Sequence, residues 1–208
     1  MRQVNLDKFI GEYEINNQIN IKCIVVGDGG VGKTHLCHVA MDNRWPEYIS
    51  GHDFSHKMIR QIQKSDNETV CTTVELFDTA GQDDYDRLRP LGYLNSHIFI
   101  LCFSVTLIES FERVMSKWIT EIRDHMGFSI PVVLMGTRSD LRLFAACRED
   151  FKGFIDYNTG EELARLVGAT SYLETSSARV RGFKDLDLFL MQCIAIDSVR
   201  KNKKCVLM

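Results

Sequence analysis

The sequence predicts an α/β fold with a mostly parallel, six-stranded sheet and helices on both faces. Two observations lead to this prediction. Strand-like apolar runs alternate with runs of helical periodicity along most of the 208 residues, and only one pair of strand-like runs is joined by a short turn. A glycine-rich string also separates the first strand-like run from the first helical one. A chain of this length has room for one full-sized hydrophobic core.

The first predicted strand is the apolar run at 19–26. Residues 27–34 follow with the sequence GDGGVGKT, which has the G-x-x-x-x-G-K-T spacing of a phosphate-binding loop, and residues 33–43 have helical character. A strand, a glycine loop and a helix N-terminus in this order allow backbone N–H groups to turn toward a phosphate. We call residues 27–34 the phosphate loop. A glycine-rich turn without a ligand is the alternative for this string alone.

Within the phosphate loop, Lys33 is expected to reach the β- and γ-phosphates, and the hydroxyl of Thr34 is expected to bind Mg²⁺. The glycines allow the backbone to approach the phosphates closely. The other nucleotide contacts predicted in and beside this loop are Gly29, Gly30, Val31, Gly32 and His35.

A loop and a hairpin are expected next. Residues 44–54 show neither helical nor strand periodicity, and they contain a Trp-Pro and a Ser-Gly pair, so they are predicted to form a loop. Residues 56–64 and 70–77 are strand-like, and the turn-forming residues 65–68 between them predict an antiparallel hairpin.

The second half of the chain alternates between buried strands and amphipathic helices. In the longest helix the apolar residues, Met115 and Trp118 among them, recur at helical spacing. The elements expected here are strands at 98–105, at 131–135 and from Tyr172, and helices at 108–126, 161–167 and 183–199.

A second motif, Asp78-Thr79-Ala80-Gly81-Gln82, follows the strand at 70–77. A carboxylate at the end of such a strand holds Mg²⁺ in phosphate-loop enzymes, so Asp78 joins Thr34 as a predicted metal ligand. The backbone N–H of Gly81 would face the γ-phosphate, and Gln82 would orient an attacking water as the catalytic residue. A polar turn between a strand and a helix is the alternative.

Polar strings after the last two strands indicate base recognition. The Asp140 carboxylate is placed to accept hydrogen bonds from N1–H and the exocyclic amine of guanine, a donor pair that adenine lacks. The stem of Arg138 would lie over the base, and a backbone N–H after the last strand would meet the guanine O6. A solvated turn would explain each string alone, and their order along the chain is the specific feature. The residues predicted around the base are Thr137, Arg138, Asp140, Leu141, Ser176, Ser177 and Ala178.

From about Ile19 to the C-terminus, the sequence resembles the Ras superfamily of small GTPases and, within it, the Rho/Rac family. The resemblance rests on the phosphate loop, on DTAGQDDYDRLRPL at 78–91, and on four shorter strings. These strings are Cys102-Phe103-Ser104, Gly136-Thr137, Asp140-Leu141-Arg142 and Tyr172-Leu173-Glu174. The resemblance implies the P-loop NTPase fold of small G proteins, with GDP or GTP as ligand and Mg²⁺ as cofactor. It also implies that residues 143–159 are a shortened Rho-type insert, a surface helix or loop.

As a Rho-family GTPase, the protein would be a molecular switch. The γ-phosphate and Mg²⁺ would hold two loops that hydrolysis releases, the first switch at 44–54 and the second switch at 79–92. Hydrolysis would be slow until an activating protein supplies an arginine, for an increase of roughly 10³–10⁵. The implied partners are exchange factors, GTPase-activating proteins, a dissociation inhibitor and effectors of the Rho type, with signalling to the cytoskeleton. We expect a monomer that does not bind nucleic acid.

The first switch departs from the family pattern. Gly51 stands where the family has a threonine that closes on Mg²⁺ and the γ-phosphate, and glycine has no hydroxyl. Ser50 or Ser55 would substitute only if the loop changes register. We therefore expect a poorly ordered first switch in the GTP form and weaker Mg²⁺ binding. The alternative function is an atypical GTP-binding scaffold with negligible hydrolysis.

Two other positions bear on base binding. Trp45 aligns with an aromatic residue that covers the guanine edge in the family, although an aromatic that caps the core is the alternative. Arg138 replaces the family's lysine with a similar stem and a planar, bulkier head. We expect guanine preference to survive through Asp140, with some loss of affinity.

The composition is that of an ordinary globular protein, with 45% hydrophobic and 25% charged residues. A net charge of −3 argues against a general polyanion binder. The seven cysteines include no C-x-x-C pair, so neither a zinc site nor a disulfide framework is predicted, and a reducing cytosol fits best. We expect no signal peptide and no membrane-spanning segment.

We expect the chain to divide into an N-terminal extension at 1–18, a GTPase domain at 19–199 and a polybasic, prenylated tail at 200–208. The tail ends Cys-Val-Leu-Met, the C-a-a-X pattern, which predicts lipidation of Cys205, with farnesyl favoured by the final Met. One lipid alone anchors a protein weakly, so a second attachment is needed. The four basic residues of the tail would supply it, at about 1 kcal/mol each near an anionic leaflet. We expect the protein at the cytoplasmic face of the plasma membrane or endomembranes, with a cytosolic pool. A solvated helix end with a free cysteine is the alternative.

Overall fold

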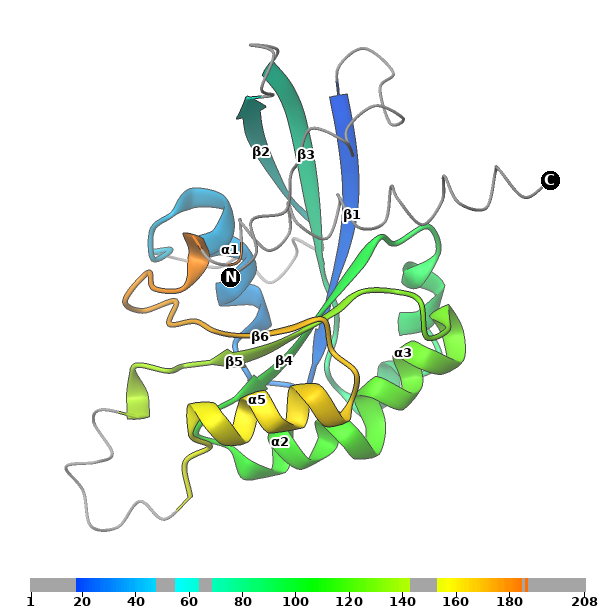
Figure 1. Ribbon diagram of the computed structural model, residues 1–208, viewed down its shortest axis with the longest axis vertical. Helices are drawn as coiled ribbons and strands as arrows, with labels where there is room; N and C mark the ends of the chain where they lie inside the picture. The colour runs from blue at the N-terminus through cyan, green and yellow to red at the C-terminus, as the bar shows by residue number, and fades with distance from the viewer. Residues whose placement is uncertain (1–17, 48–54, 64–68, 143–152, 185, 187–208) are drawn as a thin grey trace.

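The computed structural model describes residues 18–47, 55–63, 69–142, 153–184 and 186 (Figure 1). Within them, six strands form one sheet in the order β2-β3-β1-β4-β5-β6. β2 pairs antiparallel with β3, and the other neighbouring pairs are parallel, which confirms the predicted fold class. The strands are β1 (Gln18–Gly27), β2 (Ser55–Gln63), β3 (Thr69–Asp78), β4 (Ile98–Ser104), β5 (Val132–Thr137) and β6 (Ser171–Glu174).

The helices fall where the periodicity predicts them, with two differences described below. They are α1 (Lys33–Asp42), α2 (Ile108–Arg113), a π-helical turn (Val114–Trp118), α3 (Ile119–Met126) and α5 (Tyr157–Leu166). Two short 3-10 helices, Asp83–Tyr85 and Arg89–Tyr93, lie in and beside the second switch. Helical structure is present at Phe183, where the last helix is predicted to begin, and residues 185 and 187–199 of that helix lie outside the described part of the chain. No helix of the described residues is both long and apolar enough to cross a membrane.

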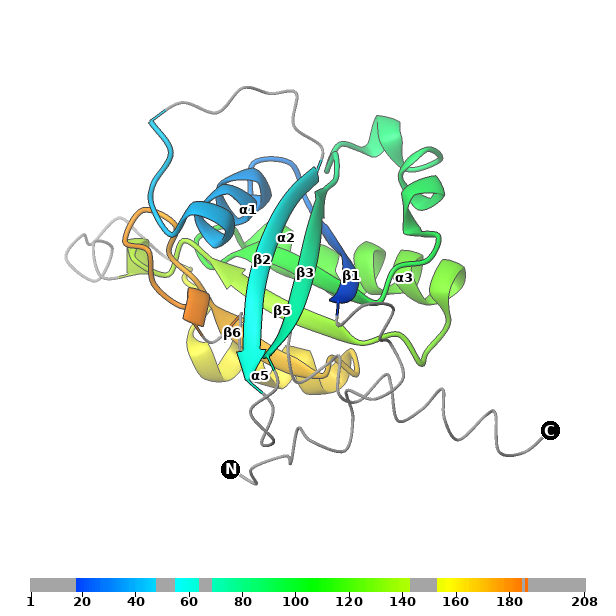
Figure 2. The ribbon, with the colours of Figure 1, turned by 90° about the horizontal axis from the view of Figure 1, so that it is seen from above.

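Both faces of the sheet are covered (Figures 1 and 2). Every residue of β4 is buried, and successive side chains alternate between two hydrophobic clusters. Ile100 belongs to the cluster that contains the buried side of α1, whereas Leu101 belongs to the cluster formed with the helical segment 108–126 and with α5. This alternation is the reason why the central strands are apolar along their whole length.

The carboxyl ends of the parallel strands meet at one edge of the sheet. The register aligns Val25 with Asp78 and Gly27 with Cys102, and it aligns Ser104 with Thr137 on the other side of β4. The segments that follow β1, β3, β5 and β6 therefore begin close together, as expected for the ligand-binding edge of an open α/β sheet.

The helix predicted at 108–126 is one continuous helical segment that contains a π turn. Trp118 is fully buried, but Met115 is 48% exposed and does not belong to the apolar face predicted for it. A π turn holds more residues than an α turn, so it displaces the apolar positions on either side of it from a single α-helical stripe.

Helix α5 begins at Tyr157 rather than at Glu161. The side chain of Asp156 caps it by accepting a hydrogen bond of 2.8 Å from the backbone N–H of Thr159. Residues 157–159, predicted as the end of the insert, therefore belong to this helix. Residues 143–152 lie outside the described residues.

Candidate nucleotide-binding site

The phosphate loop connects β1 to the first turn of α1. Gly32 caps α1 with a φ of 101°, a left-handed conformation that favours glycine. The ammonium group of Lys33 is buried and donates hydrogen bonds to the backbone carbonyls of Gly27 at 2.8 Å and Asp28 at 2.7 Å. Burial lowers the pKa of Lys33. A buried cation is thus fixed inside the loop, where an anionic ligand would offset the cost of its burial.

Thr34 and Asp78 meet at the carboxyl ends of β1 and β3. The Thr34 hydroxyl donates to the Asp78 carboxylate over 2.5 Å. The described residues contain no cluster of three or more His, Cys, Asp or Glu side chains that could hold a metal alone. Mg²⁺ in nucleotide sites takes one or two protein oxygens together with substrate phosphates, and this hydroxyl–carboxylate pair beside the phosphate loop fits that requirement.

The second switch begins in contact with the phosphate loop. A Cβ atom on Gly81 would lie 2.4 Å from the backbone nitrogen of Gly29 and 2.5 Å from the carbonyl oxygen of Gly27, so only glycine fits there. Gln82 follows at once and is exposed. Its backbone carbonyl accepts a hydrogen bond of 3.0 Å from Arg89. The predicted catalytic glutamine is therefore adjacent to a segment that touches the phosphate loop.

The end of β5 supports the phosphate loop from the opposite side. The buried Thr137 hydroxyl lies 2.6 Å from the Val31 carbonyl oxygen and 2.9 Å from that of Phe103. Arg138 has a left-handed φ of 58°, and its guanidinium donates to the Gly30 carbonyl at 2.5 Å. Arg138 thus contacts the loop as well as lining the pocket described next.

A pocket of about 240 Å³ lies between α1, the segment after it and the loops that follow β5 and β6. Each residue that lines it is one of the predicted nucleotide contacts. They are Gly32, His35, Trp45, Thr137, Arg138, Asp140, Leu141, Ser177 and Ala178.

Asp140 and Ser176 form the polar part of this region. The Ser176 hydroxyl is fully buried and donates to the Asp140 carboxylate at 2.6 Å. Ser176 therefore orients the carboxylate from behind instead of lining the pocket. A carboxylate accepts about four hydrogen bonds, so Asp140 keeps acceptor capacity for a ligand that carries two N–H groups.

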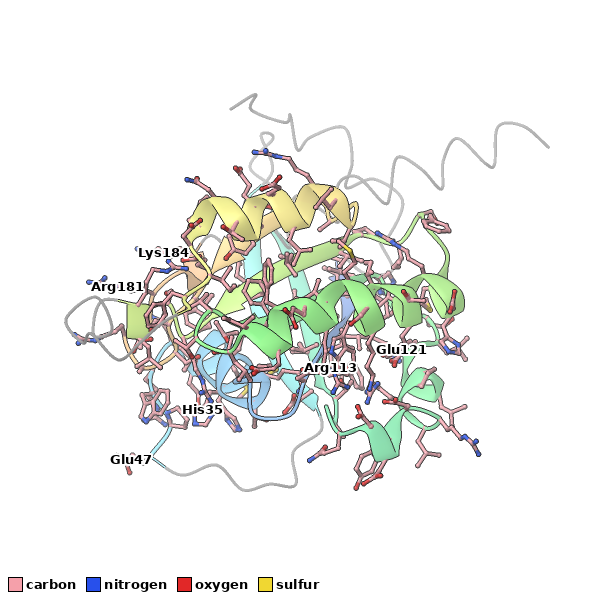
Figure 3. All side chains as sticks on the ribbon, turned by 90° about the horizontal axis from the view of Figure 1, so that it is seen from below. His35, Glu47, Arg113, Glu121, Arg181 and Lys184 are labelled. Atoms are coloured by element: carbon pink, nitrogen blue, oxygen red, sulfur yellow. The ribbon has the colours of Figure 1, made fainter. Side chains whose placement is uncertain are left out.

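Trp45 forms one side of the pocket and stacks on His35. The two ring centroids are 4.7 Å apart with an interplanar angle of 27°. Trp45 is 47% exposed, so it does not cap the core. Burial, together with the nearby guanidinium of Arg138, lowers the pKa of His35. Figure 3 shows His35 on the same side of the molecule as Glu47, the last described residue before the 48–54 gap.

Sequence reasoning misses a group of polar contacts beside the phosphate loop. The Asp28 carboxylate accepts a hydrogen bond of 2.7 Å from the indole N–H of Trp118, and the same oxygen lies 3.1 Å from Nε of Arg113. Arg89 pairs with Glu121 at 2.7 Å. Because a buried indole N–H needs a hydrogen-bond acceptor, the apolar position of Trp118 predicts that such an acceptor exists. The sequence does not identify Asp28 as that acceptor.

Two of the predicted functional segments lie outside the described residues, in addition to the parts of the insert and of the last helix named above. They are the first-switch segment around Ser50 and Gly51, and the lipidation site Cys205.

Comparisons with known proteins agree with this site. The family model described as "Ras family" matches residues 22–194, a range that contains the phosphate loop, the second switch and the base-side residues. The human protein "Rho-related GTP-binding protein RhoD" is 38% identical over 162 residues, which are 76% of this chain and 75% of that protein.

Proposed function

The chain belongs to the Ras superfamily of small GTPases and is of the Rho type, a GTP-binding switch that hydrolyses GTP, and on this premise we propose how its own residues serve that function. The phosphate loop holds the phosphates through its backbone N–H groups and Lys33. Thr34 and Asp78 would hold Mg²⁺, which would supply positive charge beside the β- and γ-phosphates. Gln82 orients the attacking water, and Asp140 selects guanine.

The pairing of Asp140 with Ser176 is the observation that carries this proposal. A carboxylate fixed by a buried hydroxyl at 2.6 Å, beside a pocket with an aromatic wall, suits a flat base with two adjacent donors. Guanine presents N1–H and an exocyclic amine in this arrangement, whereas adenine does not.

Replacement of Asp140 with Asn tests guanine selection. Asn offers one acceptor and one donor, so it matches xanthine, in which a carbonyl replaces the exocyclic amine. Because charge-assisted hydrogen bonds contribute about 1.5–3 kcal/mol each, we expect GDP to bind Asp140→Asn about 10²-fold more weakly than wild type, and XDP to bind it more tightly than GDP. Fluorescent-nucleotide titration measures both. Asp124→Asn, an exposed position in α3, is the control. Unchanged GDP affinity in Asp140→Asn would refute this role.

A scaffold that binds GTP with negligible hydrolysis is the second candidate, and Gly51 favours it. Without a threonine hydroxyl at this position, the γ-phosphate and Mg²⁺ lose one ligand that helps to close the first switch. Single-turnover GTP hydrolysis, with and without a Rho-type activating protein, separates the two candidates. Acceleration by the activating protein supports the switch, and no measurable turnover in either condition supports the scaffold.

We further propose partners of the Rho type: exchange factors, activating proteins, a dissociation inhibitor and effectors. The phosphate loop and second switch are the parts that such regulators would contact. Effectors that require the usual first-switch sequence should bind weakly, because Gly51 and its neighbours differ from that sequence.

Lipidation of Cys205 would tether the switch to a membrane. The C-a-a-X pattern supports farnesylation, and the basic residues before it would supply a second, electrostatic attachment. We expect Cys205→Ser to move the protein from the membrane fraction to the cytosolic fraction. A variant with Lys203 and Lys204 replaced by Gln should shift only partly. Unchanged fractionation of Cys205→Ser would rule out the lipid anchor.

A further inference from the structure

The π turn between α2 and α3 aligns two side chains on one carboxylate. Residues five apart lie on the same side of a π turn, because its hydrogen bonds run from i to i+5. Arg113 and Trp118 are five residues apart, and both approach the same oxygen of Asp28, at 3.1 Å and 2.7 Å. Trp118 is fully buried, so its contact with the phosphate loop is fixed by packing, while Arg113 remains about one-third exposed.

Arg113 also contacts the second switch. Its guanidinium pairs with the Asp83 carboxylate, and Lys117 pairs with Asp83 at 2.6 Å and with Asp86 at 2.7 Å. Figure 3 shows Arg113 and Glu121 on the side of the helical segment that faces the second switch. The hydrogen bonds from Lys117 and Arg113 lower the pKa of Asp83 to about 2, so Asp83 is ionised at any physiological pH.

Gln82 is therefore flanked by two attachments. On one side, the backbone of Gly81 rests against the phosphate loop. On the other side, Asp83 is held by a residue that also holds Asp28 of that loop. The first attachment is steric and the second is ionic, and Arg113 links both carboxylates.

We propose that Arg113 is a positioning residue for GTP hydrolysis, which ties Asp83 to Asp28 and so keeps Gln82 beside the phosphate loop. This proposal rests on the role proposed above for Gln82. Arg113 acts through Asp83 and does not itself touch the reacting phosphate.

The second switch has a separate support that makes this proposal testable. The side chain of Arg89 is only 1% exposed and donates to the carbonyls of Ala80 at 2.8 Å and Gln82 at 3.0 Å. It also stacks on Trp118, with 4.4 Å from its guanidinium carbon to the ring centroid. These contacts of Arg89 do not involve Arg113. Removal of the Arg113 side chain should therefore loosen the position of Asp83 without unfolding the second switch.

The experiment is a double-mutant cycle on single-turnover GTP hydrolysis by the full chain, with Arg113→Ala, Asp83→Ala and the double variant. We expect each single change to slow hydrolysis about three- to tenfold, the range that two partly exposed ion pairs supply, and the double variant to be no slower than the slower single one. Raising the salt concentration should slow Arg113→Ala less than the wild type, because only the pairs of Lys117 with Asp83 and Asp86 remain in the variant. The control is Arg165→Ala, which removes the exposed Arg165–Glu161 pair on α5.

Amide hydrogen exchange of residues 82–88 in the GDP form provides a readout that does not depend on turnover. Faster exchange in Arg113→Ala than in Arg165→Ala supports the proposal. The proposal would be overturned if Arg113→Ala changed neither the hydrolysis rate nor the exchange rate. It would also be overturned if the fold-decrease in the hydrolysis rate of the double variant equalled the product of the decreases in the two single variants. If Gln82→Leu hydrolyses GTP as fast as wild type, the role of Gln82 fails, and hydrogen exchange alone then decides whether Arg113 positions the segment.

Discussion

Two carboxylates of the site each accept a hydrogen bond from a hydroxyl group on another element. Ser176 donates to Asp140 at 2.6 Å, and Thr34 donates to Asp78 at 2.5 Å. A bond of this kind fixes the direction of the carboxylate while leaving acceptor positions for a ligand. In both cases the sequence identifies the carboxylate through its motif, but only the structure shows which hydroxyl orients Asp140.

The His35–Trp45 stack predicts a role for His35 in nucleotide retention. Trp45 is half exposed, so the imidazole of His35 supplies much of what keeps it at the pocket. Aromatic pairs contribute about 0.5–1.5 kcal/mol, so we expect His35→Ala to release GDP about two- to tenfold faster than wild type. His35→Phe, which keeps a stacking partner, should release GDP at close to the wild-type rate. Stopped-flow release of fluorescent GDP measures this. Equal rates in His35→Ala and wild type would contradict it.

The same residue predicts a pH dependence. The folded-state pKa of His35 is lowered, so between that value and the usual pKa of about 6.5 the unfolded chain binds more protons than the folded one. The stability of the nucleotide-free protein should therefore fall as the pH decreases below about 6.5. His35→Phe should lack this component. Urea unfolding at a series of pH values compares the two proteins, and parallel curves would contradict the prediction.

At the scale of elements, helix α5 and strand β6 are held at an unusually close distance. A Cβ atom on Gly160 would lie 2.3 Å from the ring of Tyr172, and this ring belongs to the cluster under α5. We expect Gly160→Ala to lower the free energy of unfolding by about 1–3 kcal/mol, because the ring or the helix must move. Gly92→Ala is the control, since a Cβ there meets no atom within 4 Å. Urea unfolding with equal losses in both variants would refute the close contact.

The sequence predicts least well the start of α5 and the π turn, where contacts with residues distant in the chain accompany the local backbone structure. The start of α5 consists of Tyr157-Asn158-Thr159-Gly160, a poor helix-forming string, and the Asp156 cap and the contact with Tyr172 stabilise it. The π turn at Val114–Trp118 is also unmarked in the sequence, because the same apolar residues fit an α-helical period. In the structure this turn lies between Arg113 and Ile119, and both Arg113 and Trp118 contact the same oxygen of Asp28.

At the scale of the whole molecule, the sheet topology brings the predicted motifs together. The strings after β1, β3, β5 and β6 are far apart in the chain, and each is weak evidence alone. Because these strands are parallel and in register, their carboxyl ends gather the motifs at one edge. The fold class, and the gathering of these motifs at one edge, are therefore predictable from motif order. The Arg113–Asp83 pair is not, since a charge pair between residues thirty apart has no periodic signature.

The proposed roles of Lys33 and Asp140 predict one ligand, a guanine nucleotide that spans the phosphate loop and the pocket beside Asp140. A ligand that binds only the folded state also stabilises it. The measurement is the nucleotide content of freshly purified, full-length protein, obtained by denaturing it and separating the released nucleotides by chromatography. We predict GDP or GTP in a roughly one-to-one ratio with the protein, and little adenine nucleotide. Protein that carries no guanine nucleotide, and takes up none when Mg²⁺ and GDP are supplied, would contradict this conclusion.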